Sequence, residues 1–318
     1  MEFNEIVGFK SEAGVRAVLQ NIKYYPFHFH SDYLEIVCLL EGHATVHVST
    51  ERYVMEPRSI HIFNSKEPHK IVSESAGGST LLIIHIDKSK YMDAYEHVDL
   101  AYFSAAAVKR QAADFPEYKL LRFKMAQVFF EYRKEKPSDF QLRALALEII
   151  DLLYSQFHDY KYIKNEYGSY NVVRRKYDGR DRDEFLRVYR IADYIEANYY
   201  EKITLNDIAA RVHLSVPFLS KYIKENIGVT FSELLSITRC SEAARLLANT
   251  EKSIDDIASI VGYTSRSHLF KHFAKCFGIS PSKYRKNVLQ DIGDAARVDL
   301  LDVDEKMCID KITKFLNE

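Results

Sequence analysis

The chain has 318 residues, a formal net charge of −1 and 47% hydrophobic residues, which suits two or three globular domains and excludes a disordered chain. Four scattered cysteines give neither a disulfide framework nor a zinc-site spacing, and no apolar run reaches the ~20 residues that span a bilayer. The N-terminus lacks the pattern of a secretory signal, so we expect a cytoplasmic protein without a membrane partner.

Residues 1–105 predict a small β-barrel. Short runs rich in β-branched and aromatic residues alternate with turn residues; these runs are Leu34–Leu40, Ala44–Ser49, Ser59–Phe63, Lys70–Ser73 and Thr80–Ile86. Many short strands at regular spacing are typical of barrels and jelly rolls. The expected fold class is therefore α+β, because helical segments follow the barrel.

A group of polar residues within this segment carries the candidate chemistry. Its pattern is His-x-His-x4-Glu-x6-Gly followed by a distant histidine, and it consists of His28, His30, Glu35, Gly42 and His69. The spacing resembles the two motifs of the cupin family. It departs from the second motif at Arg58, where glycine usually follows the turn proline.

Three interpretations of these residues are open. We favour a pocket that hydrogen-bonds a small polar effector, such as a sugar, with no metal or other cofactor and no enzymatic activity. Its expected residues are Tyr25, His28, His30, Glu35 and His69. The same donors suit iron, manganese or zinc in a metal-dependent cupin enzyme. In the third interpretation, the histidines only buttress the mouth of the barrel.

Residues 106–158 predict helices, and residues 159–183 predict an interdomain linker. The segment after Pro137, FQLRALALEIIDLLYSQF, is more apolar than one packing face requires. We expect it to cover the barrel and to form an antiparallel helical interface of a homodimer. Residues 159–183 are polar and punctuated by glycine, and we interpret Arg174, Arg175 and Lys176 as solvated.

Residues 184–290 predict two helix-turn-helix units. In the upstream unit, Leu205, Ile208 and Val212 recur at helical spacing, and a second helix follows with Ser215 as its expected N-cap. We expect Phe218 to be buried with Leu219, Tyr222 and Ile223. The residues left facing outward, and therefore expected to contact DNA, are Val216, Pro217, Ser220, Lys221 and Lys224.

The downstream unit repeats this design. Ile254, Ile257, Ala258 and Val261 form the first helix face, and Gly262 follows where a helix ends abruptly. The second helix is expected to bury Leu269, Phe270, Phe273 and Phe277 and to present Arg266, Ser267, His268 and Lys271. Because arginine is the commonest bidentate partner of guanine, we expect Arg266 and Ser267 to contact bases, with Lys271 and His268 nearer phosphates.

A helix of about eighteen residues is predicted between the units. It begins at Thr230, which with Glu233 forms a capping box, and it would span roughly 27 Å at ~1.5 Å per residue. This length is close to the ~34 Å that separates successive major grooves on one face of DNA. Residues 184–290 contain 15 Lys and Arg against 11 Asp and Glu, which fits a DNA-reading domain.

Residues of roughly 185–288 resemble the DNA-binding domain of the AraC/XylS family. The family pattern is carried by Ile254, Ile257, Ala258, Gly262, Tyr263, Ser265, Leu269, Lys271, Phe273, Gly278, Ser280, Pro281, Tyr284 and Arg285. One departure is Ala274-Lys275, since the family usually places lysine directly after the phenylalanine. The resemblance implies a dimeric transcription activator that binds double-stranded DNA and contacts RNA polymerase.

Residues 291–318 form an acidic extension beyond the usual end of such a domain. It contains eight Asp and Glu against four Lys and Arg, with an amphipathic pattern around Met307–Leu316 and no assigned function. The favoured hypothesis for the chain is an effector-controlled, sequence-specific transcription regulator. The alternatives are a metal-dependent cupin enzyme fused to a DNA-binding domain and an effector-independent regulator.

Overall fold

The computed structural model describes residues 8–9, 11–30, 33–48, 51–65, 67, 69–95, 98, 101, 103, 114–157, 160–164, 170–174, 182–294 and 299–317. The chain forms two compact units. The barrel unit comprises Phe3–His158 with Asp291–Glu318, and the helical unit comprises Asp159–Gln290 with Met1–Glu2. The barrel unit thus contains both early and late segments of the chain, with the helical unit inserted between them.

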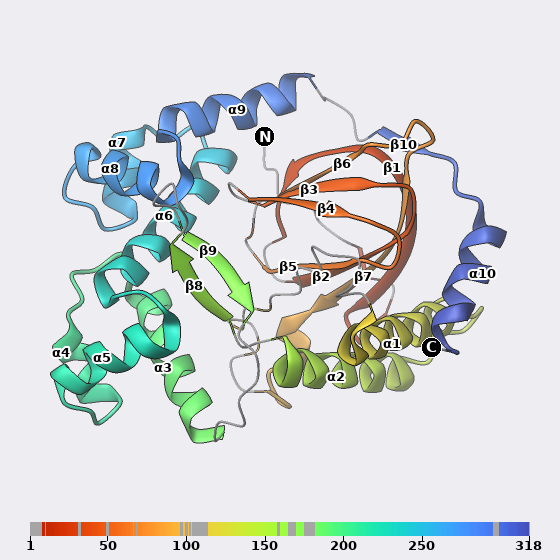
Figure 1. Ribbon diagram of the computed structural model, residues 1–318, viewed down its shortest axis with the longest axis horizontal. Helices are drawn as coiled ribbons and strands as arrows, with labels where there is room; N and C mark the ends of the chain where they lie inside the picture. The colour runs from red at the N-terminus through yellow and green to blue at the C-terminus, as the bar shows by residue number, and fades with distance from the viewer. Residues whose placement is uncertain are drawn as a thin grey trace. The chain divides into compact units, whose positions relative to one another are not determined.

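The barrel unit is built on an antiparallel sheet. Its strands are β1 (Val15–His28), β2 (Tyr33–Glu41), β3 (Ala44–Val48), β4 (Glu51–Met55), β5 (Ile60–Phe63), β6 (His69–Ser73), β7 (Ser79–Asp87) and β10 (Asp299–Leu301). They are ordered β4-β3-β6-β1-β7-β2-β5, with β10 paired to β1. Figure 1 shows the sheet curving into a nearly closed barrel, which confirms the predicted fold. Strands β1, β4 and β10 were not predicted from the sequence.

Strand β2 is buried along almost its whole length because both of its faces are covered. Val37 and Leu39 lie in the cluster that fills the barrel interior. Ile36 and Cys38 belong to a second cluster, shared with the helices outside the barrel. A strand covered on both sides has a continuous apolar run instead of a polar and apolar alternation.

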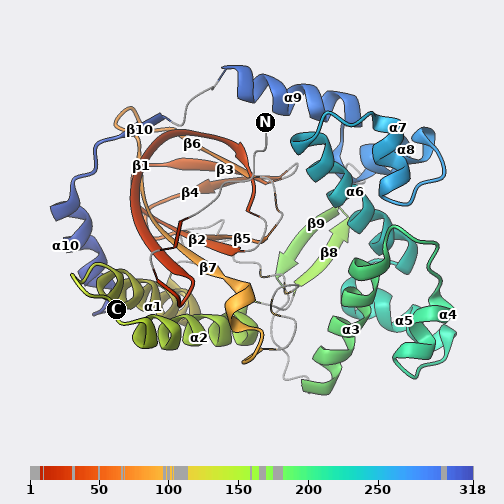
Figure 2. The same ribbon diagram turned by 180° about the vertical axis from the view of Figure 1, so that it is seen from behind.

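Three helices pack in this outer layer (Figures 1 and 2): α1 (Pro116–Tyr132), α2 (Asp139–Gln156) and α10 (Glu305–Phe315). Ser138 caps α2, since its hydroxyl accepts a hydrogen bond from the Gln141 backbone N–H. A single 3-10 turn, η1 (Lys88–Tyr91), follows β7 and places Tyr91 in the same cluster. The helices thus cover the outer face of the barrel, as expected.

The helical unit consists of a hairpin followed by seven helices: β8 (Tyr160–Lys164), β9 (Tyr170–Arg174), α3 (Arg182–Asn198), α4 (Leu205–Arg211), α5 (Val216–Ile227), α6 (Phe231–Asn249), α7 (Ile254–Ile260), α8 (Arg266–Phe277) and α9 (Pro281–Asp294). The hairpin lies inside the segment expected to be a linker and ends at Arg174, whereas Arg175 and Lys176 lie outside the described residues. In the part of the chain that the structure describes, no helix combines the length and apolarity needed to cross a bilayer.

The helix starts agree with the predicted caps, with one exception. Thr204 with Asp207 and Thr230 with Glu233 form reciprocal capping boxes at α4 and α6. At α5 the N-cap residue is Ser215, as predicted, but its side chain makes no capping hydrogen bond. Proline in the first turn of α5 compensates in part, since it removes a backbone N–H that would otherwise need a partner.

Candidate functional site

The first helix-turn-helix unit exposes one face of α5. Leu219 and Ile223 are fully buried, so the opposite face points to solvent. Of the five residues predicted to contact DNA from this helix, Val216 is half-buried and the other four are exposed, namely Pro217, Ser220, Lys221 and Lys224. Lys224 Nζ also donates a hydrogen bond to the Gly228 carbonyl, at 3.2 Å, at the end of the helix.

Phe218 differs from its expected position. Its side chain is 50% exposed, so the prediction that it belongs to the buried face of α5 is wrong. The buried positions Leu219, Tyr222 and Ile223 fill the contact with the neighbouring helices, and Phe218 lies at the edge of that face, its ring stacked on Tyr222. A large exposed apolar ring in the first turns of such a helix suits contact with thymine methyl groups.

The second unit presents a more polar face on α8. Leu269, Phe273 and Phe277 are buried, whereas Phe270 is only partly buried. The four residues predicted to contact DNA are exposed: Arg266, Ser267, His268 and Lys271. The Arg266 guanidinium lies 4.9 Å from the Phe270 ring centre and 3.5 Å from an Asp255 carboxylate oxygen. Exposed pairs of this kind are weak, so Arg266 can exchange them for a DNA contact.

Helix α6 joins the two units and has 19 residues, which corresponds to about 28 Å. Two arginines of the helical unit hold the ends of helices. Arg239 donates hydrogen bonds to the carbonyls of Tyr199 and Glu201, at 2.7 and 2.8 Å. Arg285 donates to the carbonyls of Leu247 and Lys252, at 3.3 and 2.7 Å. We therefore assign Arg239 and Arg285 to packing rather than to DNA contact.

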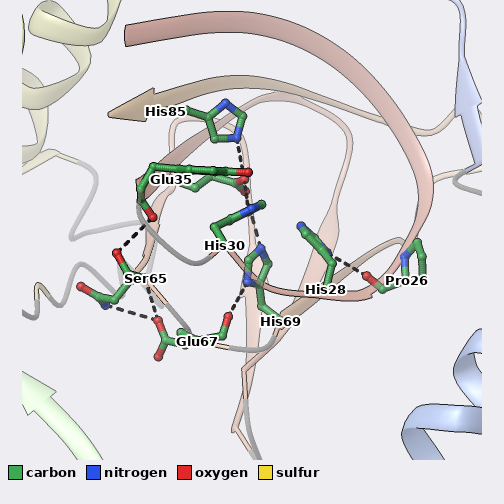
Figure 3. A network of polar contacts seen from close by, with 10 residues as sticks. Pro26, His28, His30, Glu35, Ser65, Glu67, His69 and His85 are labelled. Carbon is green, nitrogen blue, oxygen red and sulfur yellow. Dashed lines mark hydrogen bonds and ion pairs between the residues drawn. The ribbon is translucent and has the colours of Figure 1, made fainter. Parts of the chain in front are cut away.

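The barrel brings the predicted polar residues together into one buried group, the histidine cluster, defined as His28, His30, Glu35, His69 and His85 (Figure 3). Glu35 is its centre. One oxygen of its carboxylate, Oε2, accepts hydrogen bonds from His30 Nε2 at 2.8 Å and His85 Nε2 at 2.9 Å. His85 was not predicted as a site residue, because it meets Glu35 only through the pairing of β2 with β7.

Two histidines of the cluster are oriented by the backbone. His28 Nδ1 lies 2.9 Å from the Pro26 carbonyl oxygen, and His69 Nδ1 lies 2.8 Å from that of Glu67. Because a carbonyl only accepts hydrogen bonds, each Nδ1 carries the proton and each Nε2 carries a lone pair. His69 Nε2 is buried without a hydrogen-bond partner, 3.8 Å from Glu35 Oε1. An acceptor left in this way favours a ligand or ion beside it.

Burial and mutual contact set the charges in the cluster. Burial alone would raise the pKa of Glu35, but attraction to His30 and hydrogen bonds from His30 and His85 hold that pKa well below its ordinary value. Burial lowers the pKa of His28, and repulsion from His69 and His30 lowers it further. Burial also lowers the pKa of the neighbouring His61, to about 3. Glu35 is therefore ionised and His28 is neutral at neutral pH.

Aromatic rings pack against the cluster. Tyr25 lies beside His28 with ring centres 4.5 Å apart, and Tyr33 stacks on His30 at 4.5 Å. Tyr25 is half-buried, so part of its surface remains exposed. All five predicted effector-binding residues therefore lie in one place, with Tyr25 at its edge.

The cluster also fits a transition metal ion. One ligand atom from each of His28, His30, Glu35 and His69 can be chosen so that all four lie within 4.8 Å of one another. Imidazole and carboxylate suit zinc, iron and manganese, and backbone carbonyls that fix Nδ1–H are the usual outer contacts of metal-binding histidines. These four residues would hold the ion, which would act there as a Lewis acid for a polar ligand.

Two segments of the chain match known protein families. Residues 9–104 match the AraC-like ligand binding domain, and residues 208–287 match the helix-turn-helix domain. The chain is 39% identical to the lactose operon transcription activator of Staphylococcus xylosus over 93 residues, which are 29% of this chain and 33% of that protein. It is 28% identical to the melibiose operon regulatory protein of Escherichia coli (strain K12) over 151 residues, 46% of this chain and 48% of that protein.

Among solved structures, the C-terminal domain of AraT, a response regulator from Geobacillus stearothermophilus, is 35% identical. The match covers 32% of this chain and 84% of that domain, with a TM-score of 0.31. The chain thus spans about a third to a half of the length of the two curated relatives. The two matched domains, in this order, show that the chain belongs to the AraC/XylS family.

Proposed function

We propose that this chain is a sequence-specific transcription regulator, acting as an activator, whose barrel unit binds a small polar effector. The observation that carries the proposal is the pair of helix-turn-helix units, each of which exposes one face of its second helix, α5 or α8. The match of residues 9–104 to a ligand-binding domain supports the effector. Activation rests on family analogy alone.

The two reading helices, α5 and α8, are expected to contact DNA in different ways. On α8, Arg266 and Ser267 lie in the first turn, from which a helix in the major groove reaches base edges. On α5, the exposed Phe218 and the half-buried Val216 provide apolar contacts to thymine methyls. Pro217 adds a further exposed apolar surface in the first turn of α5. The remaining residues anchor phosphates through their polar groups, namely Ser220, Lys221, Lys224, His268 and Lys271.

Substitution of Arg266 tests this assignment. Operators are first selected from random duplexes with the full chain, and affinities are then measured by fluorescence anisotropy at several salt concentrations. Arg266→Ala is expected to cost about 1–3 kcal/mol and to relax base preference at one position. Lys271→Ala is expected to weaken all duplexes alike and to reduce the salt slope by about one.

Two results would contradict this assignment. If Arg266→Ala retains both the affinity and the base preference of the parent chain, α8 does not read bases. If the parent chain selects no duplex at all, it is not a sequence-specific regulator.

The proposed effector is a sugar or sugar derivative, because the cluster offers imidazole and carboxylate groups for hydroxyls and Tyr25 for stacking. The names of the two relatives, which refer to lactose and melibiose operons, support this class. A thermal-shift screen with mono- and disaccharides and sugar phosphates tests it. At a hundred times its dissociation constant, a ligand stabilises by about 2.7 kcal/mol. This shift should vanish in the His30→Ala/Glu35→Ala variant and persist in His43→Ala, which removes an exposed histidine.

A metal-dependent function is a second candidate, favoured by the buried His69 Nε2 without a hydrogen-bond partner and by the four ligand atoms that lie within 4.8 Å of one another. Its test is the same screen with Mn²⁺, Zn²⁺ and Fe²⁺. A stabilising shift with metal alone, together with one ion per chain by mass spectrometry, would favour the metal. If neither sugars nor metals change the thermal stability of the chain, an effector-independent regulator is favoured.

We also propose that the chain is a homodimer that binds two repeated half-sites and recruits RNA polymerase. The outer surface of α1 and α2 supports this. Leu120 and Phe140 are 44% and 78% exposed, and a groove between the helices is lined by Leu120 and Leu147. Exposed apolar surface of this kind is typical of interaction sites.

A further inference from the structure

The chain returns to the barrel unit at Asp291, near the end of α9. We define Asp299–Asn317 as the tail segment; it contains β10 and α10. Strand β10 pairs antiparallel with β1, with Leu301 opposite Asn21 and Leu300 opposite Ile22. Figures 1 and 2 both show β10 beside β1 and α10 beside α1. The tail segment is thus an integral part of the barrel unit.

The surface of the barrel is complementary in shape to β10 and to the residues that follow it. The Asn21 side-chain amide donates hydrogen bonds to the Gly77 and Asp302 carbonyls, each at 3.1 Å, and so ties the tail segment to a barrel loop. Gly78 has a φ of +81°, and a Cβ on it would lie 2.3 Å from Asn21 Oδ1 and 3.0 Å from Leu301 Cδ1. Glycine at this position allows the loop to close over Leu301.

Helix α10 anchors the tail segment more firmly. Ile312 and Phe315 are buried in the same core cluster as α1 and α2. The fully buried Arg122 of α1 places its guanidinium 5.5 Å from the Phe315 ring centre. Lys311 Nζ donates a hydrogen bond to the Leu40 carbonyl, at 3.2 Å. Because burial of two large apolar side chains is favourable, the tail segment is stable in its docked position.

Strand β1 connects the residues that pair with β10 to the histidine cluster. The strand pairs with β10 as far as Tyr24, then pairs with β6, and ends with His28 opposite His69. Its pairing register shifts between Ile22 and Tyr24 and again before His28. His28 and the residues that pair with β10 therefore lie on one continuous strand, and the irregular pairing fixes how that strand bends between them.

The tail segment also tethers the end of α9, the helix that follows α8 in the chain. Helix α9 ends at Asp294 and β10 begins at Asp299. Five residue steps span at most about 18 Å even when fully extended. The end of α9 can therefore move no further than this from β1 while the tail segment stays docked.

We propose that the tail segment is the connection through which the state of the histidine cluster reaches the DNA-reading helices, so that the reading domain is held at both of its ends. This inference rests on the proposed function, since it requires a reading domain that binds DNA. It assigns a role in regulation to residues 299–317, which lie beyond both matched domains.

Hydrogen–deuterium exchange of the full chain, with and without a duplex selected as above, tests the connection. Coupling between two sites is reciprocal, so DNA binding should alter exchange in β1. The expected result in the parent chain is slower exchange in α8 and an exchange rate in residues 15–28 altered by about five-fold or more. In Leu301→Pro, which removes a backbone N–H from β10, protection of α8 should remain and the change in residues 15–28 should disappear.

Matched variants separate release of the tail segment from general damage. Leu301→Ala keeps the backbone N–H and should behave like the parent chain. Ile312→Asp places a charge in the buried face of α10 and should reproduce Leu301→Pro, whereas Thr313→Asp places the same charge on an exposed position and should not.

The outcomes are distinguishable. If DNA protects α8 while residues 15–28 stay unchanged in the parent chain, or if their change persists in Leu301→Pro, the tail segment is not the connection. If DNA protects neither α5 nor α8, the proposed function itself is overturned.

Discussion

Replacement of Glu35 by glutamine is expected to destabilise the barrel unit by about 3–5 kcal/mol, the usual cost of removing one partner of a buried charged group. Glu35 is 3% exposed, and its Oε2 accepts hydrogen bonds from two buried imidazoles. Glutamine has nearly the same shape, but its single carbonyl oxygen lacks the negative charge that stabilises those N–H groups. Denaturant unfolding of the full chain in the presence of EDTA measures the loss.

The pH dependence of this loss has a definite sign. Since the pKa of Glu35 is well below its ordinary value, the folded state favours the ionised carboxyl more than the unfolded state does. The advantage of the parent chain should be complete above the ordinary carboxyl pKa of about 4.3 and should shrink as the pH falls below it. Glu12→Gln, at an exposed position, should change stability by less than about 0.5 kcal/mol. Equal stability of the two variants would contradict the central role of Glu35.

Replacement of Gly262 by alanine is expected to disrupt the second helix-turn-helix unit. Gly262 has a φ of +84°, which costs a residue with a Cβ about 1–2 kcal/mol. That Cβ would also lie 2.7 Å from the Tyr200 carbonyl oxygen and 2.9 Å from that of Tyr199, both backbone atoms. The turn between α7 and α8 must shift to relieve the contact, so we expect at least ten-fold weaker binding to the selected duplex, as at a site that loses about 1.4 kcal/mol.

Gly278→Ala is the matched control for this substitution. Its φ is +69°, but a Cβ there has no neighbour within 4 Å, so it carries the conformational cost without the clash. Circular dichroism and DNA affinity should show a small loss for Gly278→Ala and a larger one for Gly262→Ala. Equal losses in both variants would show that the contact with Tyr199 and Tyr200 does not matter.

The sequence predicts the reading domain better than the barrel because its determinants are local. Caps such as Thr230 with Glu233, and buried positions such as Leu269 and Phe273, recur at fixed spacing along single helices. The error at Phe218 arises because its exposure depends on which residues of α5 the neighbouring helices cover, and spacing alone does not decide that.

The barrel depends on contacts between distant residues, which the sequence does not display. His28, His30, Glu35 and His69 were found because a known motif spacing connects them. His85 joins them only through the pairing of β7 with β2, and its sequence context, LLIIHID, resembles any buried strand. The pairing of β10 with β1 spans nearly the whole chain, and no local pattern indicates it.

The interrupted barrel unit has a consequence for synthesis. The segment Asp159–Gln290 must be translated after the strands and helices of the barrel but before the residues that complete it. At about 5–20 residues per second, the surface that later receives Ile312 and Phe315 stays uncovered for roughly 10 s or more. During this interval the reading domain can fold first, and the nascent barrel exposes apolar surface to chaperones and proteases. A nonsense mutation between the codons of Gln290 and Asp299 would therefore damage the effector-binding barrel unit, although it falls after the DNA-reading helices in the chain.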